Sequence, residues 1–318
     1  MTQKKATPNI LILGGYGFVG RHTATKLTQL NANVLIGTRG KKRAKRYRDA
    51  ALAEAFEERK ICLEKALTAE DWHPALSDID VVINCVGLLR ERQGESFSDV
   101  HHRAVAALAT ACADQRIPLV HMSALGITYA NDAYSKSKLL GEQAILNSSC
   151  KGYIVRASLV DALDGYGASW FHKLAQLPVW PLPVGANKYL SPTKAPDLGE
   201  ALATLALRAF NTPPAKATII ETGCGEWFTL ESYLKRLRRP YRYPPLVIRV
   251  PQRLALVVAT VCDRFNLTPY TQGHHHLLEH NNVPGKNDLP DILQRNPTPI
   301  TSDLFNEEIL QDDLKELS

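Results

Sequence analysis

The fold of this chain is decided by one stretch near its start, Asn9-Ile10-Leu11-Ile12-Leu13-Gly14-Gly15-Tyr16-Gly17-Phe18-Val19-Gly20. The continuous apolar run at its beginning is typical of a central parallel strand that is buried on both faces. The glycines that follow permit a tight turn. A helix is predicted next, over residues 19–30, so the chain opens as strand, turn and helix.

The same alternation continues through the first half of the chain. Further strands are predicted over residues 33–37, 61–63, 80–86, 119–123 and 152–156, and further helices over 44–59, 100–115 and 134–146. Short strands that alternate with helices at this spacing indicate an α/β fold with a doubly wound parallel sheet, of the Rossmann type. We therefore predict a Rossmann domain over residues 1–157.

The second half, residues 158–318, is predicted to form a smaller C-terminal substrate or lid region, parts of which pack back onto the Rossmann sheet. Helices are expected over 197–210 and 229–238, and a strand over 217–220. Three prolines in residues 177–183 remove backbone donors, so this segment is predicted as a loop over the carboxyl edge of the sheet. Partial disorder is expected after Pro284, because that tail is polar and contains several prolines.

The net charge of the chain comes from one short segment. Lys+Arg 38 against Asp+Glu 32 gives +6, and seven basic residues with no acidic one lie between Arg39 and Arg48. Without these seven charges the chain carries −1, too little for a protein that coats nucleic acid through a wide basic face. No nucleic-acid partner is therefore expected. Contact of this run with nucleic acid or an anionic membrane is the weakest alternative.

Composition indicates a globular protein of a reducing compartment. A chain of 318 residues, 45% hydrophobic and 22% charged, can bury one large core or two moderate ones, which excludes a disordered or fibrous protein. Six scattered cysteines without a CxxC pair and an N-terminus without a secretion signature favour the cytoplasm.

The most apolar stretch, residues 254–262, has nine residues, whereas a spanning helix needs about 20. No transmembrane segment is predicted. A buried amphipathic helix is favoured there, with a peripheral position at the inner face of a membrane as the alternative.

Three glycines in the opening stretch are spaced for phosphate binding. Gly14, Gly17 and Gly20 form a GxxGxxG pattern between the predicted strand and helix. The first permits the tight turn, the second lets the backbone approach a pyrophosphate, and the third allows close packing of helix on strand. With Phe18 and Val19 at the helix N-terminus, this context favours dinucleotide binding over a merely structural turn.

The end of the second predicted strand selects the dinucleotide. A carboxylate there favours NAD, whereas a cation accommodates the 2′-phosphate of NADP. This chain has Thr38-Arg39, and an arginine fork suits a phosphate dianion. NADP is therefore predicted over NAD, with Arg39 as ligand and helpers drawn from Lys41, Lys42 and Arg43. For Lys45, Arg46 and Arg48 a solvated helix face is the better interpretation.

Several later motifs resemble the short-chain dehydrogenase/reductase superfamily. These are Asn84-Cys85-Val86-Gly87, Val120-His121-Met122-Ser123-Ala124-Leu125-Gly126 and Tyr134-Ser135-Lys136-Ser137-Lys138. Within it the chain is similar to the atypical branch that contains the NAD(P)H-binding accessory subunit of respiratory complex I and its free-standing bacterial relatives. The stretches that support this branch are Val86–Glu91, Ser96–His101, Ser137-Lys138 with Gly141-Glu142, and Leu267–Thr271.

The resemblance implies roles for particular residues. Tyr134 would pass a proton to or from the substrate oxygen, and Lys138, one helical turn away, would lower the pKa of Tyr134 and hold the nicotinamide ribose. Asn84, Val86 and Gly87 would lie against the cofactor. Where related enzymes polarise the substrate oxygen with Ser or Thr, this chain has Ala124, so Ser123 is the remaining candidate. The aspartate that would bind adenine is replaced by Ala66.

These features predict an NADP-dependent oxidoreductase that acts on a carbonyl or alcohol of an unknown small molecule, or an epimerase-like relative. The rival prediction is a non-catalytic NADP(H)-binding accessory or assembly subunit, with respiratory-chain subunits as partners. His274-His275-His276 with Glu279 and His280 is a candidate metal cluster, but consecutive histidines point in different directions on a helix, so no metal is predicted. For the aromatic residues Trp170, Phe171, Trp180 and Tyr189, pocket lining and packing remain equal alternatives.

Overall fold

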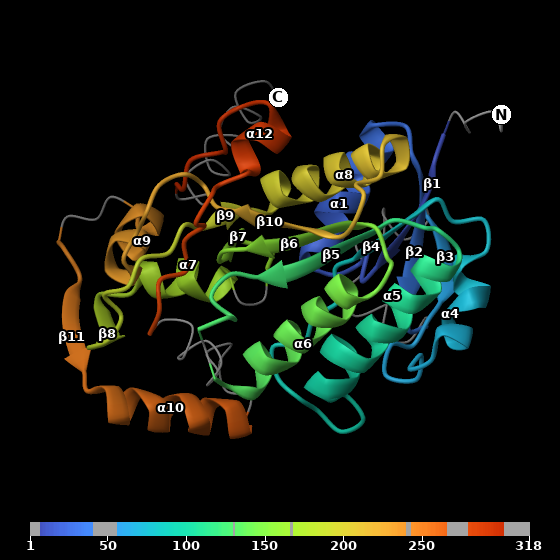
Figure 1. Cartoon of the computed structure of the whole chain (residues 1–318). Coiled ribbons are helices and arrows are strands. Elements are labelled where there is room, and N and C mark those ends of the chain that lie inside the picture. Colours follow the sequence, from blue (N-terminus) through green and yellow to red (C-terminus); the bar gives the residue numbers. More distant parts are fainter. Residues whose placement is uncertain are drawn as a thin grey trace, which may run out of the picture.

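A computed structural model describes residues 7–40, 56–129, 131–165, 168–239, 243–265 and 279–301. Its centre is a seven-stranded parallel sheet with the strand order β10-β6-β5-β4-β1-β2-β3 (Figure 1). The strands are β1 (Asn9–Leu13), β2 (Asn33–Thr38), β3 (Glu57–Lys60), β4 (Val81–Asn84), β5 (Leu119–Ala124), β6 (Gly152–Ala157) and β10 (Thr218–Thr222). The Rossmann fold class is confirmed.

Helices cover both faces of this sheet. One face carries α1 (Phe18–Gln29), α8 (Ala195–Asn211) and α12 (Leu289–Leu293), and the other carries α4 (Ala69–Leu76), α5 (Ala104–Asp114) and α6 (Ala133–Asn147). A π-helical segment, η1 (Ser98–Arg103), runs directly into α5. The strand order reverses between β1 and β4, and ligands of doubly wound sheets bind at the carboxyl ends beside such a reversal.

The remaining elements pack beyond the carboxyl edge of the sheet (Figure 1). They are β7 (Val160–Asp161), α7 (Ala168–Gln176), β8 (Val179–Pro183), β9 (Thr193–Lys194), α9 (Leu230–Leu237), β11 (Leu246–Val250) and α10 (Gln252–Phe265). Two short parallel pairs, β7–β9 and β8–β11, connect them. No helix among the described residues is long and apolar enough to cross a membrane.

A buried ionic cluster joins these elements. Asp161 is fully buried and lies 2.7 Å from the Lys194 ammonium. It also contacts His172 Nε2 at 2.8 Å and accepts a 2.6 Å hydrogen bond from the Tyr233 hydroxyl. Burial alone would raise the pKa of Asp161, but the hydrogen bond with His172 and the charge of Lys194 lower it. The cluster thus fixes β7, β9, α7 and α9 to one another.

The structure corrects several predicted elements. Residues 57–60 form β3, whereas a helix was predicted through residue 59 and a strand over 61–63; most of that helix lies outside the described residues. Residues 179–183 form a strand rather than a loop, which their prolines allow because β8 lies in an isolated two-stranded pair. After Pro284 the described residues include α12, whose Leu289, Ile292 and Leu293 are buried against the core, and residues 302–318 lie outside the described part, so partial disorder of the tail stays a prediction. The division at residue 157 stays a prediction.

Candidate functional site

The glycine loop forms one wall of a cavity at the carboxyl ends of the strands. Gly14 has a φ of +74°, which favours glycine, and its carbonyl accepts a 2.8 Å hydrogen bond from the Gly17 amide. A Cβ atom on Gly20 would lie 2.2 Å from the Gly14 carbonyl oxygen. The first turn of α1 has no acidic residue and no side-chain cap among the described residues, so its N–H groups remain available to an anion.

This cavity has a volume of about 760 Å³. Of the predicted cofactor ligands, those that line it are Gly14, Gly17, Phe18, Val19, Thr38, Arg39, Val86, Gly87 and Lys138. Gly20 lies behind the loop, against Gly14 and Gly15. Asn84 is fully buried and accepts a hydrogen bond from the Val86 amide, so it shapes the loop rather than the lining. Lys42 lies outside the described residues.

One end of the cavity is closed by an arginine between two carboxylates. Arg39 Nη1 lies 2.8 Å from Glu64 and 2.6 Å from Glu95, whose side chains are almost completely buried. Burial acts to lower the pKa of Arg39, but the hydrogen bond that Arg39 donates to Glu64 and the charge of Glu95 outweigh it and raise that pKa. Arg39 therefore stays a cation at the end of β2, where the sequence predicted a phosphate ligand.

Sequence reasoning missed Glu64 and Glu95. Ala66, the residue aligned with an adenine-binding aspartate, is buried and accepts a hydrogen bond from the Trp72 indole. Glu64 lines the cavity instead. Its position just after the predicted third strand was the available signal. For Glu95 the sequence contains no such signal, because Glu95 lies far from Arg39 in the chain and only the folded structure brings the two side chains into contact.

Tyr134 and Lys138 lie one turn apart on α6, and both line the other end of the cavity. The Lys138 ammonium donates a 3.1 Å hydrogen bond to the Met122 carbonyl at the end of β5. Burial lowers the pKa of Lys138 to about 8, partly opposed by the charge of Glu142. Burial, with a smaller contribution from Asp132, raises the pKa of Tyr134 to about 12. Tyr134 is therefore held as a neutral phenol in the nucleotide-free chain.

A buried histidine, His101, is connected to Tyr134 through Ser137. The Leu88 amide donates to His101 Nε2 at 2.8 Å, so the ring proton lies on Nδ1, which contacts Ser137 Oγ at 3.0 Å. Ser137 in turn donates to the Tyr134 carbonyl at 2.7 Å. Burial, with the nearby charge of Lys138, lowers the pKa of His101, which keeps the ring neutral.

His101 also packs edge-on against the Tyr134 ring, with centroids 5.4 Å apart. It is placed by the π-helical segment, a deviation often found at functional sites. The sequence placed His101 in a family-like stretch but gave it no role.

At the end of β5, the predicted site residue Ser123 is among the residues that line the cavity. The Ser123 side chain is buried, and its oxygen has no hydrogen-bond partner among the described residues. Ala124 lines the cavity beside it. The position where related enzymes are expected to polarise the substrate oxygen therefore carries a methyl group.

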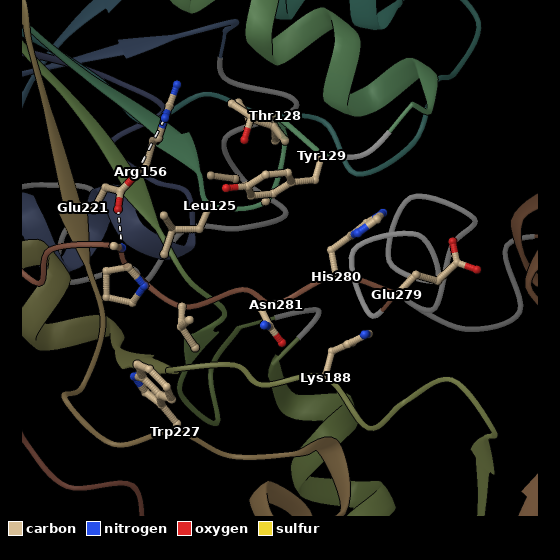
Figure 2. Close-up of a pocket in the computed structure, with 16 residues that line it drawn as sticks. Leu125, Thr128, Tyr129, Arg156, Lys188, Glu221, Trp227, Glu279, His280 and Asn281 are labelled. Carbon is tan, nitrogen blue, oxygen red and sulfur yellow. Dashed lines mark hydrogen bonds and ion pairs between the residues drawn. The ribbon is translucent and has the colours of Figure 1, made fainter.

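A second cavity of about 610 Å³ adjoins the first, because Ala124, Lys188 and His280 line both. Figure 2 shows Tyr129 and Thr128 on the loop after β5 and Arg156 extending to Glu221. Fully buried Glu142 holds Arg156 at 2.6 Å, and the Glu221 carboxylate lies 3.7 Å from it. The second cavity thus extends the first one beyond Ala124.

The aromatic and histidine candidates from the sequence differ in whether they line the first cavity. Phe171 and Tyr189 line the first cavity, whereas Trp180 is fully buried and Trp170 packs against Phe171. His274, His275 and His276 lie outside the described residues. Within the residues that are described, no group of His, Cys, Asp and Glu could hold a metal ion.

A doubly wound parallel sheet with a glycine loop after β1 and a YxxxK pair at the start of the helix after β5 defines an atypical short-chain dehydrogenase/reductase. The resemblance seen in the sequence is thereby confirmed. The chain belongs to the RmlD substrate binding domain family, whose model matches residues 8–229.

Known relatives support this placement. The Arabidopsis thaliana mitochondrial NADH dehydrogenase (ubiquinone) 1 alpha subcomplex subunit 9 is 23% identical over 262 residues, or 79% of this chain and 62% of that protein. The chain thus spans less than two thirds of this curated relative.

Two solved epimerases have the same fold. Helicobacter pylori ADP-L-glycero-D-manno-heptose-6-epimerase superposes with a TM-score of 0.64 at 14% identity, covering 94% of each chain. Thermus thermophilus UDP-glucose 4-epimerase, solved with NAD, gives a TM-score of 0.61 at 16% identity over 94% of this chain and 99% of that one.

Proposed function

We propose that the chain is an NADP-dependent oxidoreductase that acts on a carbonyl or alcohol through Tyr134 and Lys138. The observation that carries this proposal is that both side chains line the same cavity as Gly14 and Gly17 of the glycine loop. The pair needed for proton transfer and the cradle suited to a pyrophosphate thus share one binding space.

The lining of the cavity fits a nicotinamide dinucleotide. A Cβ on Gly17 would lie 2.9 Å from the Gly14 carbonyl oxygen, so the loop keeps its tight turn and leaves backbone amides for phosphate oxygens. Arg39 would meet the adenosine ribose at the end of β2, and Lys138 the nicotinamide ribose. When bound, such a cofactor supplies or accepts the hydride.

The chain's own residues would manage the proton and the second reactant. Tyr134 would donate its phenol proton to a carbonyl oxygen, and the Lys138 cation would stabilise the phenolate that remains. The adjoining cavity would hold the rest of the substrate. Its charged lining residues are Arg156, Lys188, Glu221 and Glu279, which favour a polar group.

Arg39→Ala is expected to weaken NADPH binding at least about tenfold and to change NADH binding less than about threefold. A hydrogen bond to a charged group contributes about 1.5–3 kcal/mol, and without Arg39 the carboxylates of Glu64 and Glu95 would repel the 2′-phosphate. Titration calorimetry with both nucleotides measures the ratio of the affinities for NADPH and NADH. Arg208→Ala, at an exposed site on α8, is the control. Equal losses for NADPH and NADH would contradict the role of Arg39.

Tyr134→Phe is expected to lower turnover at least about 100-fold while NADPH affinity stays within about threefold. General acid catalysis contributes about 10²–10⁴, and the variant removes only the hydroxyl. Purified chain is incubated with NADPH and a panel of aldehydes and ketones while reduced nicotinamide is followed by absorbance. Tyr243→Phe, at an exposed tyrosine, is the matched control. Undiminished turnover in the Tyr134 variant would exclude Tyr134 as the acid.

A second candidate function is a non-catalytic NADP(H)-binding accessory or assembly subunit of a respiratory-chain complex. It is favoured by Ala124 at the polarising position, by the buried Ser123 oxygen and by the similarity to the plant complex I subunit. Nucleotide would then stabilise the fold by linkage without reacting. Stabilisation by NADPH with no turnover on the whole panel, together with co-purifying respiratory-chain subunits, would select this function.

A further inference from the structure

Helix α10 presents its large apolar side chains to solvent. Leu254, Val257, Val258 and Val261 are 53%, 57%, 47% and 43% exposed and follow the spacing i, i+3, i+4, i+7 of one helix face. The buried stripe consists of the small residues Ala255, Ala259 and Cys262. The prediction of a buried amphipathic helix is therefore wrong in orientation, because the apolar stripe faces outward.

The strand before α10 continues this exposed surface. Leu246 and Ile248 alternate outward along β11 and are 62% and 48% exposed, and Val184, whose amide donates to the Val250 carbonyl, is also exposed. In Figure 1, α10 lies along the lower edge of the molecule, just below β8 and β11. We name Val184, Leu246, Ile248 and the four α10 residues the apolar edge.

Positive charge accompanies the apolar edge. Between Glu231 and Asp263 the sequence has seven basic residues and no acidic one: Lys235, Arg236, Arg238, Arg239, Arg242, Arg249 and Arg253. Lys235 and Arg249 share the carboxylate of Glu231, Arg236 pairs with Glu226, and Glu279 contacts Gln252 at the start of α10. Exposed Arg253 directly precedes the apolar stripe on α10. Cations beside an exposed aliphatic face are complementary to a surface in which a layer of anionic groups covers an apolar interior.

We propose that the apolar edge docks in the plane of an anionic phospholipid bilayer. The 14-residue helix α10 is about 21 Å long, too short to span a hydrocarbon core of about 30 Å but suited to lie in the headgroup region. Its apolar face is purely aliphatic, whereas cores of protein interfaces are enriched in aromatic residues and Met. This inference does not depend on nucleotide binding or turnover.

The test measures binding of the full chain to vesicles of phosphatidylcholine alone and of phosphatidylcholine with phosphatidylglycerol, by flotation. Wild type is expected to float with the anionic vesicles and much less with the neutral ones. Val257→Gln/Val258→Gln should weaken partitioning at least about tenfold, because two aliphatic side chains no longer enter the lipid. Leu140→Gln/Leu146→Gln, at 44% and 42% exposed leucines of α6, should bind as wild type does. Arg249→Gln/Arg253→Gln should remove most of the preference for anionic vesicles.

A gain-of-signal variant keeps the test valid if the glutamine variant folds poorly. Val258→Trp should show a blue-shifted tryptophan emission, quenched by brominated lipid, when anionic vesicles are added, and Leu146→Trp should not. Absence of wild-type binding, or equal binding by wild type and the Val257/Val258 variant, would overturn the proposal. The proposal would also be overturned if the wild-type chain does not bind vesicles but forms a dimer that the Val257/Val258 variant dissociates. The apolar edge would then be an interface with a second copy of the chain.

Discussion

Gly20→Ala is expected to weaken NADPH binding at least about 100-fold, with a loss of stability that nucleotide does not restore. The added methyl group would lie 2.2 Å from the Gly14 carbonyl oxygen and 2.8 Å from the Gly15 Cα, which are backbone atoms of the phosphate loop. The loop can relieve this contact only by moving away from α1. The N–H groups that would face the pyrophosphate then lose their alignment.

Calorimetry with NADPH, together with urea unfolding with and without nucleotide, measures both effects. The matched control is Gly185→Ala, because a Cβ there meets no atom closer than 3.8 Å and φ is unstrained. That variant should keep wild-type affinity. If Gly20→Ala also bound NADPH normally, the glycine loop would not be the pyrophosphate site.

Lys138→Met is expected to abolish turnover and yet to stabilise the nucleotide-free protein at pH 7, by up to about 3 kcal/mol. The reason is burial, which lowers the pKa of Lys138 to about 8 from an ordinary value of 10.5. At neutral pH the folded chain therefore carries the Lys138 ammonium as a cation at a buried site, where a charge is unfavourable. Methionine has a similar shape without the charge, so the folded state no longer carries this cost.

The pH dependence of this effect has a defined sign. Above pH 8 the folded protein releases the Lys138 proton while the unfolded chain keeps it up to about 10.5, so wild-type stability rises through this window. The advantage of Lys138→Met should therefore fall to about half by pH 9.5. Urea unfolding at pH 7.0 and 9.5 measures it, and the exposed Lys216→Met should change stability by less than about 0.5 kcal/mol at either pH. A variant less stable than wild type at pH 7 would refute the argument.

The alternating strands of the sheet were predictable because each is a short apolar run between polar or glycine-rich turns. Strand β3 was not, because its sequence Glu57–Lys60 is entirely charged; pairing with β2 at the sheet edge, rather than side-chain burial, makes it a strand. Helix α10 was located but wrongly oriented. Periodicity identifies an apolar face, yet nothing in the sequence says whether that face meets the core or solvent.

The site was predictable where a motif is local. Tyr134, Lys138 and the glycine loop were identified as candidates because their spacing within one helix or turn carries the signal. The Arg39–Glu64–Glu95 group and the His101–Ser137 contact were missed because each joins residues from separate elements, and only the packed structure brings them together.

The contact of α8 with α1 affects how the chain folds during its synthesis. Leu198, Leu202 and Leu205 of α8 cover the same apolar layer as Val19 and Leu27 of α1, and β10 completes the sheet beside β6. A nascent chain that has emerged only to residue 157 therefore exposes to water the part of that layer that α8 covers. Such long-range closure slows folding and leaves apolar surface open during synthesis. We expect the nascent chain to need chaperone protection until about residue 222 has left the ribosome.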